Sequence, residues 1–325
     1  MADQQDDSAP KTVPASLPRL GRPRDLLIGA ALLVGLFIAV DKSVGWATLL
    51  SPWLRLSPWL LLVAFVLTAL SYLLRAVRVY DFFGAPLQGR FITVLRLSVL
   101  HNSANNLLPM RTGEMVFPWL MRRYFGHGFL AAGASLLWIR LMDLHVLGLA
   151  GLLVLWLRDP AWLWPLAALI WIALLPATAK LASHAASKPG GHGRLWRIAR
   201  FIAESGPARP TLIGRLYLWT ALTWLLKLAA FAAVLRHFLA VDFWKVLAGV
   251  IGAELSSVLP FHGIAGAGSY ELATVAAMLP FGVSATDALT GAVNLHLFVL
   301  GTTLILGLFA LLIPRGPIVE QQAAR

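Results

Sequence analysis

Several long apolar runs constrain the fold of this chain more than any other feature. Each has the roughly 20 residues that a helix needs to cross the hydrocarbon core of a bilayer. The strongest are Pro58–Val79, Phe129–Leu157, Ala161–Ala182, Leu212–Arg236 and Ala288–Ile313. Only 13% of the residues are charged and none is cysteine, which excludes a soluble globular domain, a disordered chain and a disulfide-built secreted module.

A shorter apolar run, Leu26–Val40, follows Arg22 and Arg24 near the N-terminus. It has the length of a signal-peptide core, but no small-residue cleavage site follows closely. We therefore predict an uncleaved first helix that begins near Asp25 and extends past Lys42. Residues 1–24 are polar and proline-rich, and we expect them to form a disordered cytoplasmic tail.

Two further apolar segments are interrupted by residues that break helices. Phe91–Phe125 is interrupted at Asn105–Asn106, Pro109 and Gly113; the second segment, Phe243–Phe281, is interrupted at Pro260, Gly263, Gly266 and Gly268. Broken backbone is tolerated at membrane depth where protein or a water-filled cavity covers it. We therefore predict an all-α polytopic membrane protein with about six full spans and two broken re-entrant helical hairpins.

The distribution of basic residues predicts the orientation. Residues 180–215 carry seven Lys and Arg against the single acid Glu204, which places this loop in the cytoplasm. The N-terminal tail and the C-terminal tail, residues 316–325, are then also cytoplasmic, and residues 25–315 form a single transmembrane domain. The net charge of +12 fits basic loops beside anionic lipid headgroups, and no motif indicates nucleic-acid binding.

The two broken segments share a pattern. Residues 105–111 and residues 256–262 both read polar, polar, apolar, Leu, Pro, apolar, basic. The repeat halves, about 58–157 and 212–313, would cross the membrane in opposite directions, as in transporters built from inverted-topology repeats. The alternative is that proline and glycine simply kink two unrelated helices.

Ionisable residues inside apolar segments are costly and are therefore candidate site residues. In the first half we select a group in which Arg111 could hold a phosphate through its guanidinium fork and Arg140 could pair with Asp143, three residues away. The group is Asn105, Asn106, Arg111, Glu114, Arg140 and Asp143. The alternative is an internal ionic network that only holds the hairpin together.

The second half carries a small-residue loop whose backbone N–H groups could contact an anion. Its candidates are His262, Gly266, Gly268 and Glu271. The alternative is close packing of the hairpin arms. Lys227 needs a partner at its depth, for which Glu254 and Glu271 are available. We predict that Arg75 and Arg78 extend to the cytoplasmic face from the end of their span.

No spacing in the sequence indicates a metal site, a catalytic nucleophile with its base, a cofactor motif or an ATPase motif. We therefore predict no catalytic residues, no metal and no cofactor.

At these residues the chain resembles the flippase-like family of the lysylphosphatidylglycerol synthase transmembrane region. The resemblance rests on Asn105–Glu114, on the Arg-x-x-Asp of Arg140–Asp143, and on the glycine-containing segment Pro260–Glu271, and it covers roughly residues 25–315. The synthases of this family carry a soluble aminoacyl-transferase domain. This chain ends at Arg325, soon after the last apolar run, so we expect a stand-alone member without lysyl transfer.

The resemblance implies a transporter of the bacterial inner membrane that moves or presents an anionic lipid between leaflets through a central polar cavity. Phospholipid, hopanoid and polyprenyl-phosphate lipids remain open as the substrate. Two alternatives also stay open: an integral-membrane lipid-modifying enzyme, and a non-catalytic partner of an envelope lipid or glycolipid synthesis complex. A homo-oligomer and lipid-synthesis enzymes are the protein partners left open.

Overall fold

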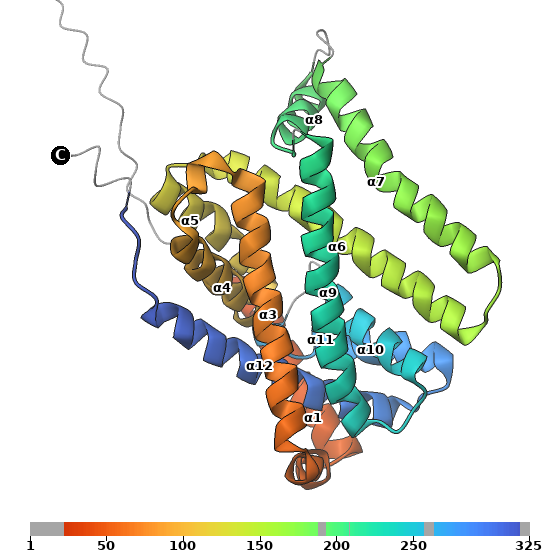
Figure 1. Cartoon of the computed structure of the whole chain (residues 1–325). Coiled ribbons are helices and arrows are strands. Elements are labelled where there is room, and N and C mark those ends of the chain that lie inside the picture. The colour runs from red at the N-terminus through yellow and green to blue at the C-terminus, as the bar shows by residue number, and fades with distance from the viewer. Residues whose placement is uncertain (1–22, 188–192, 208, 257–262, 319–325) are drawn as a thin grey trace, which may run out of the picture.

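A computed structural model describes residues 23–187, 193–207, 209–256 and 263–318 of the chain. All regular secondary structure in these ranges is helical (Figure 1). Almost all of the predicted N-terminal tail, most of the C-terminal tail and part of the basic loop 180–215 lie outside the described residues.

The α-helices are α1 (Pro23–Ser43), α2 (Trp46–Leu50), α3 (Pro58–Phe83), α4 (Phe91–Leu107), α5 (Val116–Phe125), α6 (Phe129–Arg158), α7 (Leu163–Ser187), α8 (Arg194–Glu204), α9 (Pro210–Phe238), α10 (Phe243–Ser256), α11 (Ser269–Met278) and α12 (Ala285–Leu312). Short 3-10 helices connect them: η1 (Ser51–Arg55), η2 (Ala85–Leu87), η3 (Pro109–Met115), η4 (Ile264–Gly266) and η5 (Leu279–Phe281).

Four helices in the described ranges, α3, α6, α9 and α12, are long and apolar enough to cross a membrane. They match four of the six predicted spans. The predicted first helix is present as α1, and the chain bends by 94° directly after it, between Ala30–Ser43 and Trp46–Arg55. The described count of spans reaches five only if this bent pair forms one span. The bend follows from Gly45, whose φ of +78° ends the helix, and from Pro52 in the short helix beyond it.

The predicted interruptions are present in both broken segments. In the first, η3 separates α4 from α5. Gly113 makes this fold possible, because a Cβ at this position would lie 2.6 Å from the Cα of Asn105 in α4. In the second, α10 and α11 pack against each other on either side of residues 257–268, and η4 within this stretch contacts η3 of the first segment. The two interruptions therefore lie together in the folded chain.

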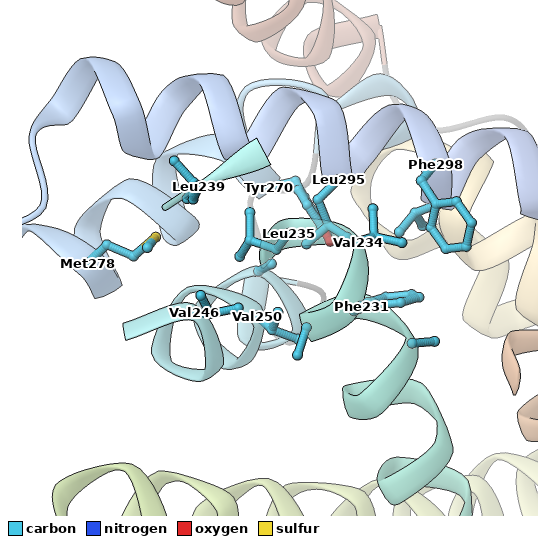
Figure 2. Close-up of a cluster of buried hydrophobic side chains, with 14 of the residues drawn as sticks. Phe231, Val234, Leu235, Leu239, Val246, Val250, Tyr270, Met278, Leu295 and Phe298 are labelled. Atoms are coloured by element: carbon cyan, nitrogen blue, oxygen red, sulfur yellow. The ribbon is translucent and has the colours of Figure 1, made fainter. Parts of the chain in front are cut away.

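The main hydrophobic core lies among the second-half helices. Figure 2 shows Phe231 and Leu235 of α9 facing Val250 of α10 and Leu295 of α12, with Tyr270 of α11 at the same cluster. Burying side chains of this size stabilises the fold by about 1.5–3 kcal/mol each. This core holds α9 to α12 together and leaves the space between α3, α6 and α9 for polar side chains.

Helices α6 and α7 form a long hairpin that projects from the bundle (Figure 1), and the amphipathic helix α8 packs against both of its arms. The indole Nε1 of Trp138 on α6 donates a hydrogen bond to the carbonyl oxygen of Ile202 on α8 at 2.8 Å. The described part of the basic loop is thus held to α6 by specific contacts.

Candidate functional site

A cavity of about 280 Å³ lies between the long helices, with walls from α3, α4, η3, α6, α9 and α10. Its lining combines charged and amide side chains with leucines. The lining residues are Tyr72, Arg75, Asn102, Asn105, Asn106, Glu114, Leu137, Arg140, Leu141, Asp143, Leu144, Leu147, Trp224, Lys227 and Glu254. Most of the predicted binding residues are among them, including both asparagines of the first half and the Lys227–Glu254 pair.

Asp143 on α6 joins three helices at one wall of the cavity. Its Oδ1 accepts hydrogen bonds from Arg78 Nη1 at 2.6 Å and from Trp224 Nε1 at 3.0 Å. Arg78, on α3, also donates to the hydroxyl of Thr220 on α9 at 2.9 Å. The other carboxylate oxygen of Asp143, Oδ2, lies 3.3 Å from Nη1 of Arg140, as the three-residue spacing on α6 predicted. A buried carboxylate with this many charge-assisted donors is held ionised and in place.

Glu114 on η3 is the second anchor. Its Oε1 accepts from Arg140 Nε at 3.0 Å and from Asn105 Nδ2 at 2.9 Å. His101 lies beside this pair, with Nε2 3.8 Å from Glu114 Oε2. Arg140 therefore bridges Glu114 and Asp143, and it ties the interruption of the first broken segment to α6.

The remaining predicted groups of this region are also bonded within the protein. Lys227 on α9 pairs with Glu254 on α10, with 2.6 Å between Nζ and Oε2. Of the two predicted partners, Glu254 and Glu271, the structure therefore shows Glu254. Asn106 Nδ2 donates to Tyr72 at 3.2 Å and to Thr303 at 2.9 Å. The pair on α9 and α10 closes the side of the cavity nearest the hydrophobic core.

Arg75 and Arg78 do not extend to a membrane face as predicted; they are 6% and 2% exposed. The prediction failed because α3 packs along α9, which turns this face of α3 into the bundle. Arg78 pairs with Asp143. Arg75 lines the cavity, and among the described residues no carboxylate lies within ion-pair distance of it. Its guanidinium carbon lies over the Trp224 ring, 5.5 Å from the ring centroid.

In the part of the chain that the structure describes, the cavity lining has three cations and three carboxylates, and Arg78 behind Asp143 adds a fourth cation to the network. Its cations are Arg75, Arg140 and Lys227 in the lining and Arg78 directly behind Asp143, against the carboxylates Glu114, Asp143 and Glu254. An uncompensated buried charge is destabilising by several kcal/mol. An anionic group in the cavity beside Arg75 would remove this penalty.

One wall of the cavity is apolar and continues to the outside of the bundle. Leu137, Leu141 and Leu144 lie on one face of α6, line the cavity, and are 43%, 46% and 41% exposed. A polar compartment thus opens beside an apolar strip that faces the surroundings of the helix. This combination matches the two parts of an amphiphile, a polar head and hydrocarbon chains.

The second group of predicted residues lies apart from the cavity lining. Glu271 accepts a hydrogen bond from the Gly268 amide at 2.8 Å, and the Gly266 amide donates to the carbonyl oxygen of Gly263 at 3.0 Å. These amides are bonded within the loop, and anion binding by them stays a prediction. His262 lies outside the described residues, as does the side chain of Arg111, so their predicted roles also stay predictions.

In the described ranges no cluster of three His, Cys, Asp or Glu residues has the geometry to hold a metal ion. The site is built from charge pairs and amides, which bind polar or anionic groups through hydrogen bonds.

Sequence reasoning missed Arg75 and Arg78 as site residues, although a signal was present. Thr68, Ser71, Arg75 and Arg78 recur at three- and four-residue spacing on α3, and all four are buried. A polar stripe of this kind on an otherwise apolar helix indicates a face turned into the bundle. His296, which bonds to Glu271, was also not among the predicted site residues.

Comparison with known proteins adds one finding to this geometry. No curated protein matches the chain. A family model described as the lysylphosphatidylglycerol synthase transmembrane region matches residues 26–307, a stretch that includes every residue of the cavity wall. The chain is therefore a membrane protein that belongs to the family of the lysylphosphatidylglycerol synthase transmembrane region, and its function is related to membrane lipids.

Proposed function

We propose that this protein is a lipid transporter that moves or presents an anionic lipid between the leaflets of the bacterial inner membrane. The headgroup would enter the polar cavity while the acyl chains stay along the leucine strip of α6. The observation that carries the proposal is Arg75, a buried guanidinium that faces the cavity without a carboxylate partner among the described residues.

The chemistry of the cavity favours a group with a single negative charge, such as a phosphodiester. Arg75 can donate two parallel hydrogen bonds to phosphate oxygens. The other cations at the cavity, Arg78, Arg140 and Lys227, pair with carboxylates: Asp143, Glu114 and Glu254, respectively. A ligand with one negative charge would therefore balance the charge of Arg75. In a bilayer, the molecules that carry such a charge on hydrocarbon chains are anionic lipids.

The fold supplies a physical basis for movement. The interruptions η3 and η4 contact each other, and η3 carries Glu114 into the cavity wall. In the proposal, the two broken segments are re-entrant hairpins of an inverted-topology repeat, and both termini are cytoplasmic. Rocking of one half against the other would expose the cavity to each leaflet in turn.

The test is a headgroup-accessibility assay in proteoliposomes with fluorescent phosphatidylglycerol and, for comparison, a zwitterionic analogue. Removing a hydrogen bond to a charged group costs about 1.5–3 kcal/mol, so Arg75→Gln is expected to slow movement of the anionic lipid roughly 10- to 100-fold. Arg75→Lys keeps the charge, and its rate of anionic-lipid movement is expected to lie between those of the wild type and Arg75→Gln. Arg236→Gln, at an exposed position of α9 outside the cavity, is the matched control.

An Arg75→Gln protein that moves phosphatidylglycerol at the wild-type rate would refute the role of Arg75. Mass spectrometry of the lipid after the assay separates transport from modification: an altered lipid would support the enzyme alternative. If the wild-type protein moves no lipid but copurifies with an enzyme of envelope lipid or glycolipid synthesis, the result supports the alternative of a non-catalytic partner.

A further inference from the structure

A second buried polar cluster lies outside the cavity lining, where α11 packs against α12. Glu271 of α11 is 2% exposed and His296 of α12 is 5% exposed. The carboxylate oxygen Oε1 of Glu271 lies 2.6 Å from the ring nitrogen Nδ1 of His296. The ring of Tyr270 stacks on the imidazole at a centroid distance of 4.4 Å.

The hydrogen-bond partners of His296 determine how many protons the pair holds. Its Nε2 lies 2.9 Å from the carbonyl oxygen of Ala265, which can only accept, so Nε2 carries a hydrogen. A neutral imidazole then has a bare lone pair at Nδ1, facing an oxygen of Glu271. Two lone pairs at 2.6 Å repel each other. The geometry therefore requires a further proton between Nδ1 and Oε1, carried by either atom.

We propose that Glu271 and His296 form a proton-binding site, and that uptake and release of this proton shift η4 and thereby couple the proton to lipid movement. The existence of the site does not depend on the proposed function, whereas its coupling to lipid movement does. Release converts the pair from a carboxylic acid beside a neutral imidazole, or a carboxylate beside an imidazolium, into a carboxylate beside a neutral imidazole, with one proton passed to water.

The backbone beside His296 gives the proton a mechanical consequence. Ala265 has φ of +52°, a left-handed conformation that is strained for a residue with a Cβ. The bond from His296 Nε2 to its carbonyl helps to hold this conformation. Once the proton leaves, repulsion between Nδ1 and Glu271 favours a rotated ring, and the bond to Ala265 is lost.

The strained residue lies at the contact between the two halves. Its helix η4 packs against η3, α4 and α1, and η3 carries Glu114 of the cavity. A change in η4 is therefore transmitted directly to the cavity wall. The contact between η4 and η3 is therefore sufficient to couple the proton site to the cavity.

The other titratable groups on the packed elements do not neutralise Glu271 in the described part of the chain. Tyr270 on α11 has a buried hydroxyl without a hydrogen-bond partner there, and it lies in the field of both Glu271 and Glu254. Other charged groups on these elements bond elsewhere. Glu254 and Lys245 on α10 pair with Lys227 and Asp242, and His101 on α4 and Glu114 on η3 contact Arg140. Arg96 on α4 donates to the Ala310 carbonyl oxygen and the Tyr124 hydroxyl, Asp41 on α1 pairs with Lys42, and Asp287 on α12 accepts from Ser284.

The decisive variant is Glu271→Gln, because glutamine reproduces the proton-loaded state. Its oxygen can accept from the Gly268 amide, its NH₂ can donate to His296 Nδ1, and Nε2 can still donate to Ala265. All three hydrogen bonds remain, but no proton can leave. Asp287→Asn, at an exposed position in the first turn of the same α12, is the matched control.

The site is tested first without transport. The full-length protein with ¹⁵N-labelled histidine is reconstituted in phosphatidylglycerol vesicles, and His296 is assigned by comparison with His296→Asn. We expect either two protonated ring nitrogens or, with one, an infrared band of a carboxylic acid that Glu271→Gln removes. A neutral imidazole beside an ionised carboxylate throughout the range of about pH 5–8 would overturn the proposal.

Coupling is tested with the lipid-movement assay under an imposed pH gradient. We expect the gradient to change the rate or direction of movement in the wild type and in Asp287→Asn, and this dependence to be lost in Glu271→Gln. Lipid movement that ignores the gradient in the wild type would overturn the coupling. A wild type that moves no lipid would refute the proposed function, while the spectra still decide whether the proton site exists.

Discussion

Replacing Asp143 with asparagine tests whether the charge network around the cavity holds the fold together. The carboxylate is 4% exposed and accepts hydrogen bonds from Arg78, Arg140 and Trp224. The asparagine side chain has almost the same shape as aspartate but no charge. Arg78, which is 2% exposed, would then be a buried cation with only neutral acceptors among the described residues, the hydroxyl of Thr220 and the amide oxygen of the new asparagine.

The expected loss follows from breaking a buried ion pair by removing one partner, which costs about 3–5 kcal/mol. At about 1.36 kcal/mol per factor of ten, the ratio of folded to unfolded protein falls roughly a hundred- to several-thousand-fold. A long chain shifts its melting temperature by about 2 °C per kcal/mol, so the variant should melt roughly 6–10 °C lower.

The assay is thermal unfolding in detergent, followed by the size-exclusion profile of the remaining monodisperse protein. Glu204→Gln is the control, because it breaks a half-exposed pair with Arg200 that is worth about 0.3–0.5 kcal/mol. The double variant Arg78→Leu/Asp143→Leu should be more stable than either single one, because it removes both charges. A melting shift for Asp143→Asn no larger than that of Glu204→Gln would refute this reasoning.

Two further predictions concern the close approaches that form the broken segments. Gly113→Ala places a methyl group against the backbone of Asn105, which cannot move aside, and should lower stability by about 1–3 kcal/mol, whereas Gly151→Ala, with open space around it, should not. Gly252→Val forces α10 away from the Ala273 carbonyl oxygen of α11, only 2.8 Å from a Cβ at this position, and should lower the melting temperature in the same assay. Wild-type melting of either variant would show that the helices pack less closely than described.

Much of the architecture could be predicted from the sequence because apolar length and helix-breaking residues act locally. The runs at 58–79, 129–157, 212–236 and 288–313 correspond to four helices of spanning length, and Pro109 and Gly113 marked a real interruption. The path of the chain after the first apolar run was harder to predict, because the bend depends on Gly45 and Pro52 beyond the end of that run. Local hydropathy does not reveal that a span bends by 94°.

The ion-pair partners of the charged residues were harder to predict from the sequence, because they depend on which helices pack against each other. Arg140 and Asp143 could be paired from their spacing on one helix. The bonds from Arg78 to Asp143 and from Lys227 to Glu254 join separate helices, and no local spacing specifies them. The same reason explains why Arg75 was assigned to a membrane face: its position near the end of an apolar run suggested exposure, and only the packing of α3 on α9 buries it.

Pairing also separates the charges that hold the structure from the charge that is available to a ligand. Arg78 donates hydrogen bonds to Asp143 and Thr220 across α3, α6 and α9, so removing these groups should lower the stability. Arg75 lies one helical turn away on the same face of α3, in the same low-dielectric surroundings, and contacts an aromatic ring where a carboxylate would be expected. Among the described residues this buried cation has no carboxylate within ion-pair distance, and in the proposed function the lipid headgroup supplies the missing negative charge. A variant that removes the charge of Arg75 should therefore slow lipid movement without lowering the melting temperature, whereas a variant at Asp143 should impair both.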